Sequence, residues 1–214
     1  MKDFYMSGHV NLTPYAPSIS TGESSEICQC GGVVYDIDHK NISLVIEGKR
    51  KLSDHLMCGA YPLIVVSTKV IEAWEKYNVT GYKAFPVKKL VNVKGNEMIT
   101  DMKYFNVQVT GKEVELDFEE MGVYVKNQCP ICGKCEFNKE VWEFGKPIIK
   151  EDTYDGSDWF LTGYFKSPLC TKRILEITFK EKLKNFRFRS FEAFQNHTGD
   201  FSDVDLKVMF GKKH

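Results

Sequence analysis

The stretch Cys129-Pro130-Ile131-Cys132-Gly133, read with Cys28-Gln29-Cys30-Gly31-Gly32 far earlier in the chain, decides how this protein folds. Two thiols three positions apart on a tight turn can point at one cation. A glycine after them allows the positive φ that turns backbone amides toward the sulfurs. One such knuckle supplies two ligands, whereas a closed zinc site needs four. The two knuckles therefore predict one shared structural zinc (Zn²⁺).

The second knuckle contains an additional thiol, so its ligands are open to choice. Cys135 follows Cys132 closely enough to replace it as the fourth ligand, and the CxC spacing of the first knuckle is less typical. A structural zinc of this kind contributes about 10–16 kcal/mol of apparent binding free energy to folding, so the site would act as a staple. The predicted metal ligands are Cys28, Cys30, Cys129 and Cys132, with Cys135 as the possible substitute.

The remaining cysteine chemistry points away from disulfides and from redox catalysis. Seven cysteines are an odd number, and residues 1–10 lack the apolar run of a secretory signal, so we expect reduced thiols in a cytoplasmic protein. A redox dithiol at the CxxC would begin a helix, whereas residues 133–138 are typical of a turn and a strand. Cys58 and Cys170 are predicted to pack as small core residues.

Hydrophobic periodicity predicts an α+β fold that is mostly β with two helices. Alternating apolar residues indicate strands at 33–37, 42–46 and 114–118. A first helix is predicted at 68–77 after Ser67 as N-cap. A second is predicted at 168–182, with Ser167 as N-cap and Pro168 at the first helical position. Each leads into a predicted strand, 81–87 and 185–191.

A shift of 104 positions aligns the chain with itself. It matches Ser53-Asp54 with Ser157-Asp158, Glu72 with Glu176, and Cys28 with Cys132. Chance similarity between two amphipathic helix-to-strand units is the alternative explanation. A duplication would give two similar halves, pseudo-repeats 28–94 and 129–191, within a single domain of residues 1–214, clamped by the knuckles as in a zinc ribbon.

Composition excludes several classes of protein. The chain has 214 residues, 43% of them hydrophobic, which is enough for a substantial core and argues against disorder. Its apolar runs fall short of the ~18 residues that span a bilayer, so no membrane partner is expected. Because 29 basic residues balance 29 acidic ones, a strongly basic nucleic-acid binder is disfavoured.

Patterns typical of catalysis are sparse. The five histidines form no HxxxH or HxH pattern, and no nucleophile-elbow or phosphate-loop motif is present. Asp54 and Asp158 each follow a serine; turn or cap roles explain them better than acid/base chemistry. We therefore expect no catalytic residues and a protein that is not an enzyme.

An acidic strip lies between the halves. Five carboxylates fall within eight positions, and their usual role is to solvate an edge strand and discourage unwanted pairing. The alternative is a docking surface for a basic protein, where complementary charge raises association rate and specificity. The candidate partner-binding residues are Glu113, Glu115, Asp117, Glu119 and Glu120.

The paired knuckles, residues 66–74 running into 79–87, and Asp155-Gly156-Ser157-Asp158-Trp159-Phe160 together resemble the double-CxxCG motif proteins. These are similar to immunity proteins of bacterial polymorphic-toxin systems. The resemblance covers roughly residues 28–191, and the CxC spacing at Cys28 departs from the family pattern. It implies a non-enzymatic cytoplasmic protein that binds and neutralises a cognate toxin domain, with zinc as scaffold.

Two other functions stay open. A zinc-ribbon module that binds nucleic acid would need clustered basic residues at the knuckles, where the sequence offers Lys126, Lys134 and Lys139. A thiol- or zinc-dependent enzyme would need an accessible low-pKa thiolate or a metal with an open position.

Overall fold

The computed structural model describes residues 4–8, 18–21, 23–46, 52–57, 63–139, 148–163 and 168–190. The predicted α+β class, mostly β with two helices, is confirmed. The helices are α1 (Thr68–Lys76) and α2 (Lys172–Lys180), with a short 3-10 turn η2 at Glu151–Thr153. The strands are β1 (Phe4–Gly8), β2 (Ser18–Thr21), β3 (Glu23–Ile27), β4 (Val33–Ile37), β5 (Ser43–Ile46), β6 (His55–Met57), β7 (Ile64–Ser67), β8 (Tyr82–Pro86), β9 (Lys89–Asn92), β10 (Tyr104–Val109), β11 (Val125–Gln128), β12 (Cys135–Phe137), β13 (Trp159–Leu161), β14 (Pro168–Thr171) and β15 (Arg187–Ser190).

Two four-stranded antiparallel sheets form the body of the protein. Their strand orders are β6-β7-β10-β8 and β13-β14-β1-β15. Elements of the two sheets correspond at the 104-residue spacing: β6 begins at 55 and β13 at 159, β7 at 64 and β14 at 168, α1 at 68 and α2 at 172. The exception is the third strand. Where the first sheet has β10, the second has β1 from the start of the chain, so a long-range pairing completes the second sheet.

The predicted start of the second helix is wrong. Pro168 begins strand β14, and α2 starts at Lys172 after Thr171 as N-cap. Proline is tolerated at the first position of a strand, and Pro168 lies beyond the part of β14 that pairs with β1, so its missing N–H breaks no ladder bond there. Ser167 lies outside the described residues. The first helix was predicted within one residue of its observed end, and Ser67 is its N-cap residue.

The main core lies where the two halves meet. Trp74 of α1 and Trp159 of β13 are fully buried, with ring centroids 5.4 Å apart. The buried residues of the two helices are Val70, Ile71, Ala73 and Trp74 in α1, and Ile174, Leu175, Ile177 and Thr178 in α2. Cys170 is also fully buried here, as predicted. The halves therefore share one apolar core.

Asp54, just before β6, ties the first half to the second. Its buried carboxylate accepts a hydrogen bond from the Ser67 hydroxyl at 2.9 Å. It also accepts one from the backbone N–H of Lys184, in the other half, at 2.8 Å. The Ser67 hydroxyl makes no capping bond to α1. A buried carboxylate must be satisfied in this way, since an unpaired one is very costly.

Asp158, just before β13, makes the reciprocal contacts. The Thr171 hydroxyl donates to its carboxylate at 3.1 Å, and the backbone N–H of Thr80, in the first half, donates at 3.0 Å. Arg173 adds an ion pair at 2.8 Å. Both aspartates therefore make structural contacts, as the repeated Ser-Asp pair in the sequence indicated. Neither of them caps a helix.

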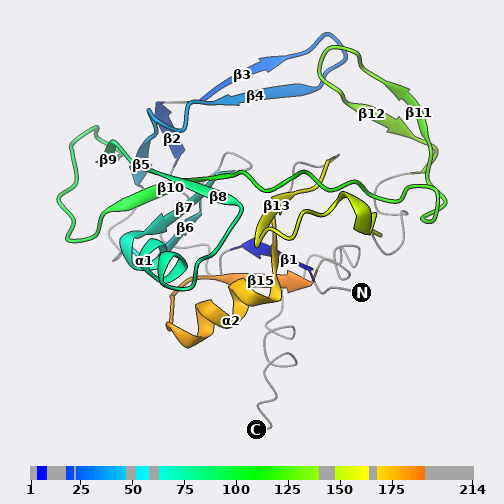
Figure 1. The fold of residues 1–214 in the computed structure, drawn as a ribbon. Helices are drawn as coiled ribbons and strands as arrows, with labels where there is room; N and C mark the ends of the chain where they lie inside the picture. The colour runs from blue at the N-terminus through cyan, green and yellow to red at the C-terminus, as the bar shows by residue number, and fades with distance from the viewer. Residues whose placement is uncertain are drawn as a thin grey trace, which may run out of the picture.

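Two β-hairpins project from this body. The hairpin of β3 and β4 and the hairpin of β11 and β12 reach toward each other and meet at their tips, so that they form an arch (Figure 1). The strands predicted at 33–37 and 42–46 correspond to β4 and β5. Among the described residues, no helix is long and apolar enough to cross a membrane.

The strand predicted at 114–118 is absent. Val114 and Leu116 are buried as expected. Each makes a single isolated β-bridge, Val114 with Thr162 and Leu116 with Ile149. The alternation of apolar and acidic residues therefore predicted which side chains face inward, while the lack of a continuous partner strand prevents a ladder.

Candidate metal centre

The first knuckle is the turn between β3 and β4. The backbone N–H of Gly31 donates to the carbonyl of Cys28 at 2.7 Å, and Gly31 has a φ of 75°. This left-handed conformation is readily adopted by glycine. Gly32 is needed for a second reason: a Cβ there would lie 2.7 Å from the Cys132 sulfur, closer than atoms in contact permit.

The second knuckle is the turn between β11 and β12, and it repeats this geometry. The N–H of Gly133 donates to the carbonyl of Cys129 at 2.9 Å, and Gly133 has a φ of 73°. The N–H of Cys129 pairs with the carbonyl of Lys134 at 2.8 Å, which closes the turn. The glycine after each cysteine pair thus has the backbone conformation expected from the sequence.

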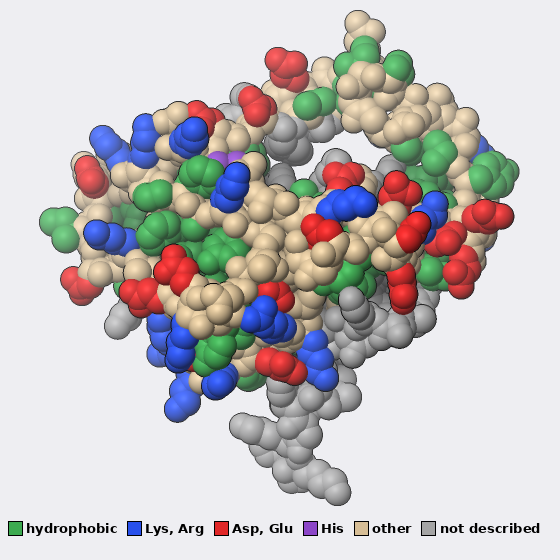
Figure 2. All heavy atoms as spheres, in the orientation of Figure 1, with side chains coloured by type: hydrophobic (Ala, Val, Ile, Leu, Met, Phe, Trp, Pro, Cys, Tyr) green, Lys and Arg blue, Asp and Glu red, His purple; other side chains and the backbone are tan. Residues whose placement is uncertain are grey.

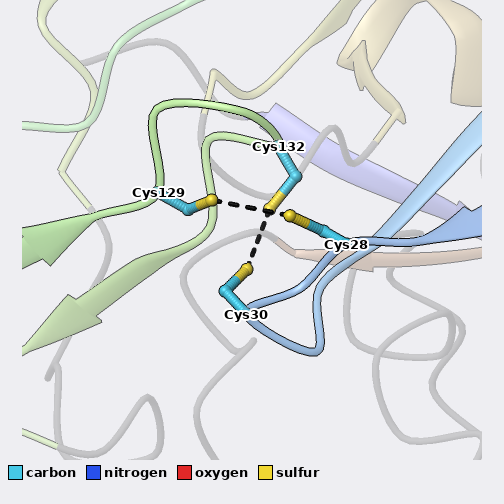
Figure 3. Close-up of side chains that lie close together, drawn as sticks. All are labelled: Cys28, Cys30, Cys129 and Cys132. Atoms are coloured by element: carbon cyan, nitrogen blue, oxygen red, sulfur yellow. Dashed lines mark hydrogen bonds between the residues drawn. The ribbon is translucent and has the colours of Figure 1, made fainter.

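The four predicted ligand cysteines lie together at the top of the arch. Cys28 Sγ lies 3.6 Å from Cys129 Sγ, and Cys30 Sγ lies 3.3 Å from Cys132 Sγ. All four sulfurs lie within 4.8 Å of one another. Figure 3 shows them turned toward a common centre, two from each hairpin.

These distances suit a tetrahedral metal. A tetrahedron with metal–sulfur bonds of about 2.3 Å has edges of about 3.8 Å, close to both cross-hairpin distances. Four thiolates around one ion make a closed site, the arrangement of structural rather than catalytic metals. Soft thiolate ligands in this geometry favour zinc or iron over magnesium or calcium. The four cysteines could therefore hold a metal ion.

The electrostatics of the cluster favour a cation. Backbone N–H groups of Cys132 and Ile131 point at the Cys129 sulfur and lower the pKa of that thiol to about 6. The N–H of Lys134 likewise favours the Cys132 thiolate, but the neighbouring thiols, Cys30 foremost, and desolvation outweigh it and raise the pKa of Cys132 to about 12. Four thiolates this close repel one another, and a divalent ion at their centre would offset that repulsion.

Of the other cysteines, Cys135 is not a member of the four-cysteine group. Cys135 lies outside the cluster, and its sulfur donates to the carbonyl of Gly133 at 3.3 Å. Cys132, and not the suggested substitute Cys135, therefore completes the group. Cys58 lies outside the described residues. Gly32 is the member of this site that sequence reasoning missed; its place opposite Cys132 depends on how the two hairpins meet, which no local pattern encodes.

The acidic strip lies on the surface below the β11–β12 hairpin, where acidic side chains gather in Figure 2. Glu113, Glu115, Glu119 and Glu120 are exposed, whereas Asp117 is partly buried and accepts a hydrogen bond from the N–H of Glu120. Glu115 forms an ion pair with Lys150 at 3.6 Å. The bridge between Leu116 and Ile149 brings Glu151 and Asp152 alongside, so two segments contribute to this acidic surface.

No protein-family model and no curated protein matches this chain.

Proposed function

We propose that this protein is a non-enzymatic, immunity-type binding protein that neutralises a cognate bacterial toxin domain and whose arch is held closed by a structural zinc. The four-cysteine cluster supports the metal-binding part of this proposal, because it brings together two hairpins from separate halves. The toxin-binding part rests on the resemblance to the double-CxxCG motif proteins. Cys28, Cys30, Cys129 and Cys132 would hold the ion. A bound zinc would offset the negative charge of the four thiolates and hold the two hairpins together, and the rest of the protein would supply the binding surface.

The acidic surface is the proposed contact for the toxin domain. Several of its carboxylates are exposed, and the Lys150 pair is itself largely exposed, with side-chain exposures of 42% and 66%, so it neutralises little of the surface. The zero net charge of the chain hides this local excess of acidic side chains, since most of the Lys and Arg side chains visible in Figure 2 lie away from it, on the left and lower parts of the view. A basic toxin domain would be attracted to such a surface, and its association would weaken with salt.

Co-expression with the toxin domain encoded by an adjacent reading frame tests the function. Wild-type protein should abolish toxicity and co-purify with that domain. The double variant Glu113→Lys/Glu115→Lys should lose protection, whereas Glu72→Lys/Glu176→Lys, which reverses two exposed charges on the helices, should retain it. If wild-type protein neither protects nor binds, the immunity proposal is wrong. If both double variants protect, the toxin contacts another surface.

A further inference from the structure

The sulfurs of one hairpin lie directly against those of the other. Cys30 Sγ is 3.3 Å from Cys132 Sγ, and Cys28 Sγ is 3.6 Å from Cys129 Sγ. Each close pair contains one cysteine from the β3–β4 turn and one from the β11–β12 turn. A disulfide needs its sulfurs at about 2.05 Å, so side-chain rotations that move them by little more than an ångström would suffice.

We infer that these four thiols form a second kind of clasp, in which a peroxide converts the metal-free cluster into two disulfide bonds between the hairpins, Cys30–Cys132 and Cys28–Cys129. The arch then stays closed when the metal is lost under oxidising conditions. Pairing within each turn would have the opposite effect, because it would leave the hairpins unjoined. This inference rests on the positions of the thiols and holds whether or not the protein neutralises a toxin.

The reaction starts at the most accessible sulfur. Cys30 is exposed, whereas Cys132 is partly buried. The Cys30 thiolate attacks one oxygen of hydrogen peroxide, the O–O bond breaks, and the departing hydroxide takes a proton to become water, leaving a sulfenic acid. Cys132 then attacks the Cys30 sulfur as the Cys132 thiol proton passes to the departing hydroxide, so that the S–S bond forms, the S–O bond breaks and a second water leaves. Each disulfide thus consumes two thiols and one peroxide, and the peroxide is reduced to two waters.

Cys135, the first residue of β12, provides a matched control beside the second turn. Its thiol is partly buried and donates to the carbonyl of Gly133, away from the four-sulfur group. Replacing Cys135 with serine should therefore leave both cross-hairpin bonds unchanged. Replacing Cys30 should remove one of them and leave Cys28–Cys129 intact.

The experiment uses the full-length chain, stripped of metal with a chelator under reducing conditions and then treated with hydrogen peroxide. Denaturing alkylation should find the reactive thiols falling from seven to three per chain, since four of the seven cysteines become bonded. Peptide mapping by mass spectrometry should identify the Cys30–Cys132 and Cys28–Cys129 linkages. The Cys135→Ser variant should show the same two linkages, and Cys30→Ser should show the second alone.

Hydrogen exchange gives a second readout. The amide of Cys28, which donates to the carbonyl of Gly32, should exchange more slowly in the oxidised metal-free protein than in the reduced metal-free protein. Linkages within the turns, Cys28–Cys30 and Cys129–Cys132, would overturn the inference, as would oxidation that leaves seven reactive thiols or stops at sulfenic acid. Loss of toxin neutralisation alone would not affect it.

Discussion

The two halves share a framework, but they hold their central aspartates differently. Asp158 receives an Arg173 ion pair at 2.8 Å and a bond from the Thr80 hydroxyl at 3.3 Å, in addition to its Thr171 and backbone contacts. Asp54 has a lysine, Lys69, at 3.9 Å in the place of that arginine. Positions 104 residues apart therefore make reciprocal contacts between the halves, and the contact at Asp158 has more donors than the contact at Asp54. The second half, whose sheet is completed by the distant strand β1, has the more strongly bonded aspartate.

Replacing each central aspartate by alanine should give the largest difference between the halves in the free energy of unfolding. Asp158→Ala should lower the free energy of unfolding by about 3 kcal/mol, and Asp54→Ala by about 2 kcal/mol, because fewer donors are left unpaired in the first half. We discount the arginine contribution, since its side chain is 45% exposed. Chemical denaturation measures both, with the exposed Asp36→Ala as control. A larger loss for Asp54→Ala would contradict the comparison.

The knuckles also differ in how they use glycine. A Cβ at Gly32 would meet the Cys132 sulfur at 2.7 Å, whereas one at Gly133 would meet nothing within 4 Å and would suffer from its positive φ alone. Gly32→Ala should therefore weaken metal affinity about 10-fold or more. Gly133→Ala should weaken metal affinity less, because its only cost is the strain of an alanine at positive φ. Competition with a chelating indicator measures the affinities; equal losses in both variants would argue against the close approach at Gly32.

Replacing each basic residue by the one found in the other half should make the stabilising contributions of the two ion pairs more alike. Arg173→Lys should cost about 1 kcal/mol, because lysine lacks the fork that reaches both Asp158 and the carbonyl of Tyr77. Lys69→Arg should gain about 0.5 kcal/mol by approaching Asp54 more closely. Thermal and chemical denaturation of the two variants provide the test, and a stabilising Arg173→Lys would show that the arginine is not the stronger partner.

The smallest expected effect concerns a contact between the halves that contains a titratable carboxyl group, that of Glu181. Hydrogen bonds from Lys76 and then Tyr77 lower the pKa of Glu181 below its ordinary value of 4.5. The stabilisation is therefore complete above that value and is lost as the pH falls through the lowered pKa. Tyr77 occupies the position in the first half that corresponds to Glu181 in the second. The Lys180 ammonium lies 4.9 Å from the centre of the Tyr77 ring, and this contact contains no carboxyl group.

Glu181→Gln should thus destabilise the protein at neutral pH and have no effect in strong acid, as measured by denaturation across the acid range. Lys180→Gln should show a weaker dependence on acid, because the charge of Lys180 contributes less than Lys76 and Tyr77 to the lowered pKa of Glu181. An equal cost for Glu181→Gln at all pH values would indicate that the hydrogen-bond geometry, and not the charge, is what matters.

Chemistry that is local in the chain could be predicted from the sequence. Cysteine spacing and the glycines after each pair identified the ligand group, because a coordination turn is encoded within a few residues. The second helix was misplaced since Ser167-Pro168 is a local start signal that β-pairing overrides. The 104-residue alignment of Ser67 with Thr171 places that N-cap correctly. The insertion of β1 into the second sheet depends on pairing across the whole chain, so no pattern within the strand could reveal it.

Metal analysis of the purified full-length protein tests the four-cysteine clasp most directly. Wild-type protein and Cys135→Ser should each contain one zinc per chain, and Cys28→Ser and Cys129→Ser should lose it and melt at a lower temperature. A full-length protein that contains no metal, and whose melting temperature is unchanged by Cys28→Ser and Cys129→Ser, would contradict it.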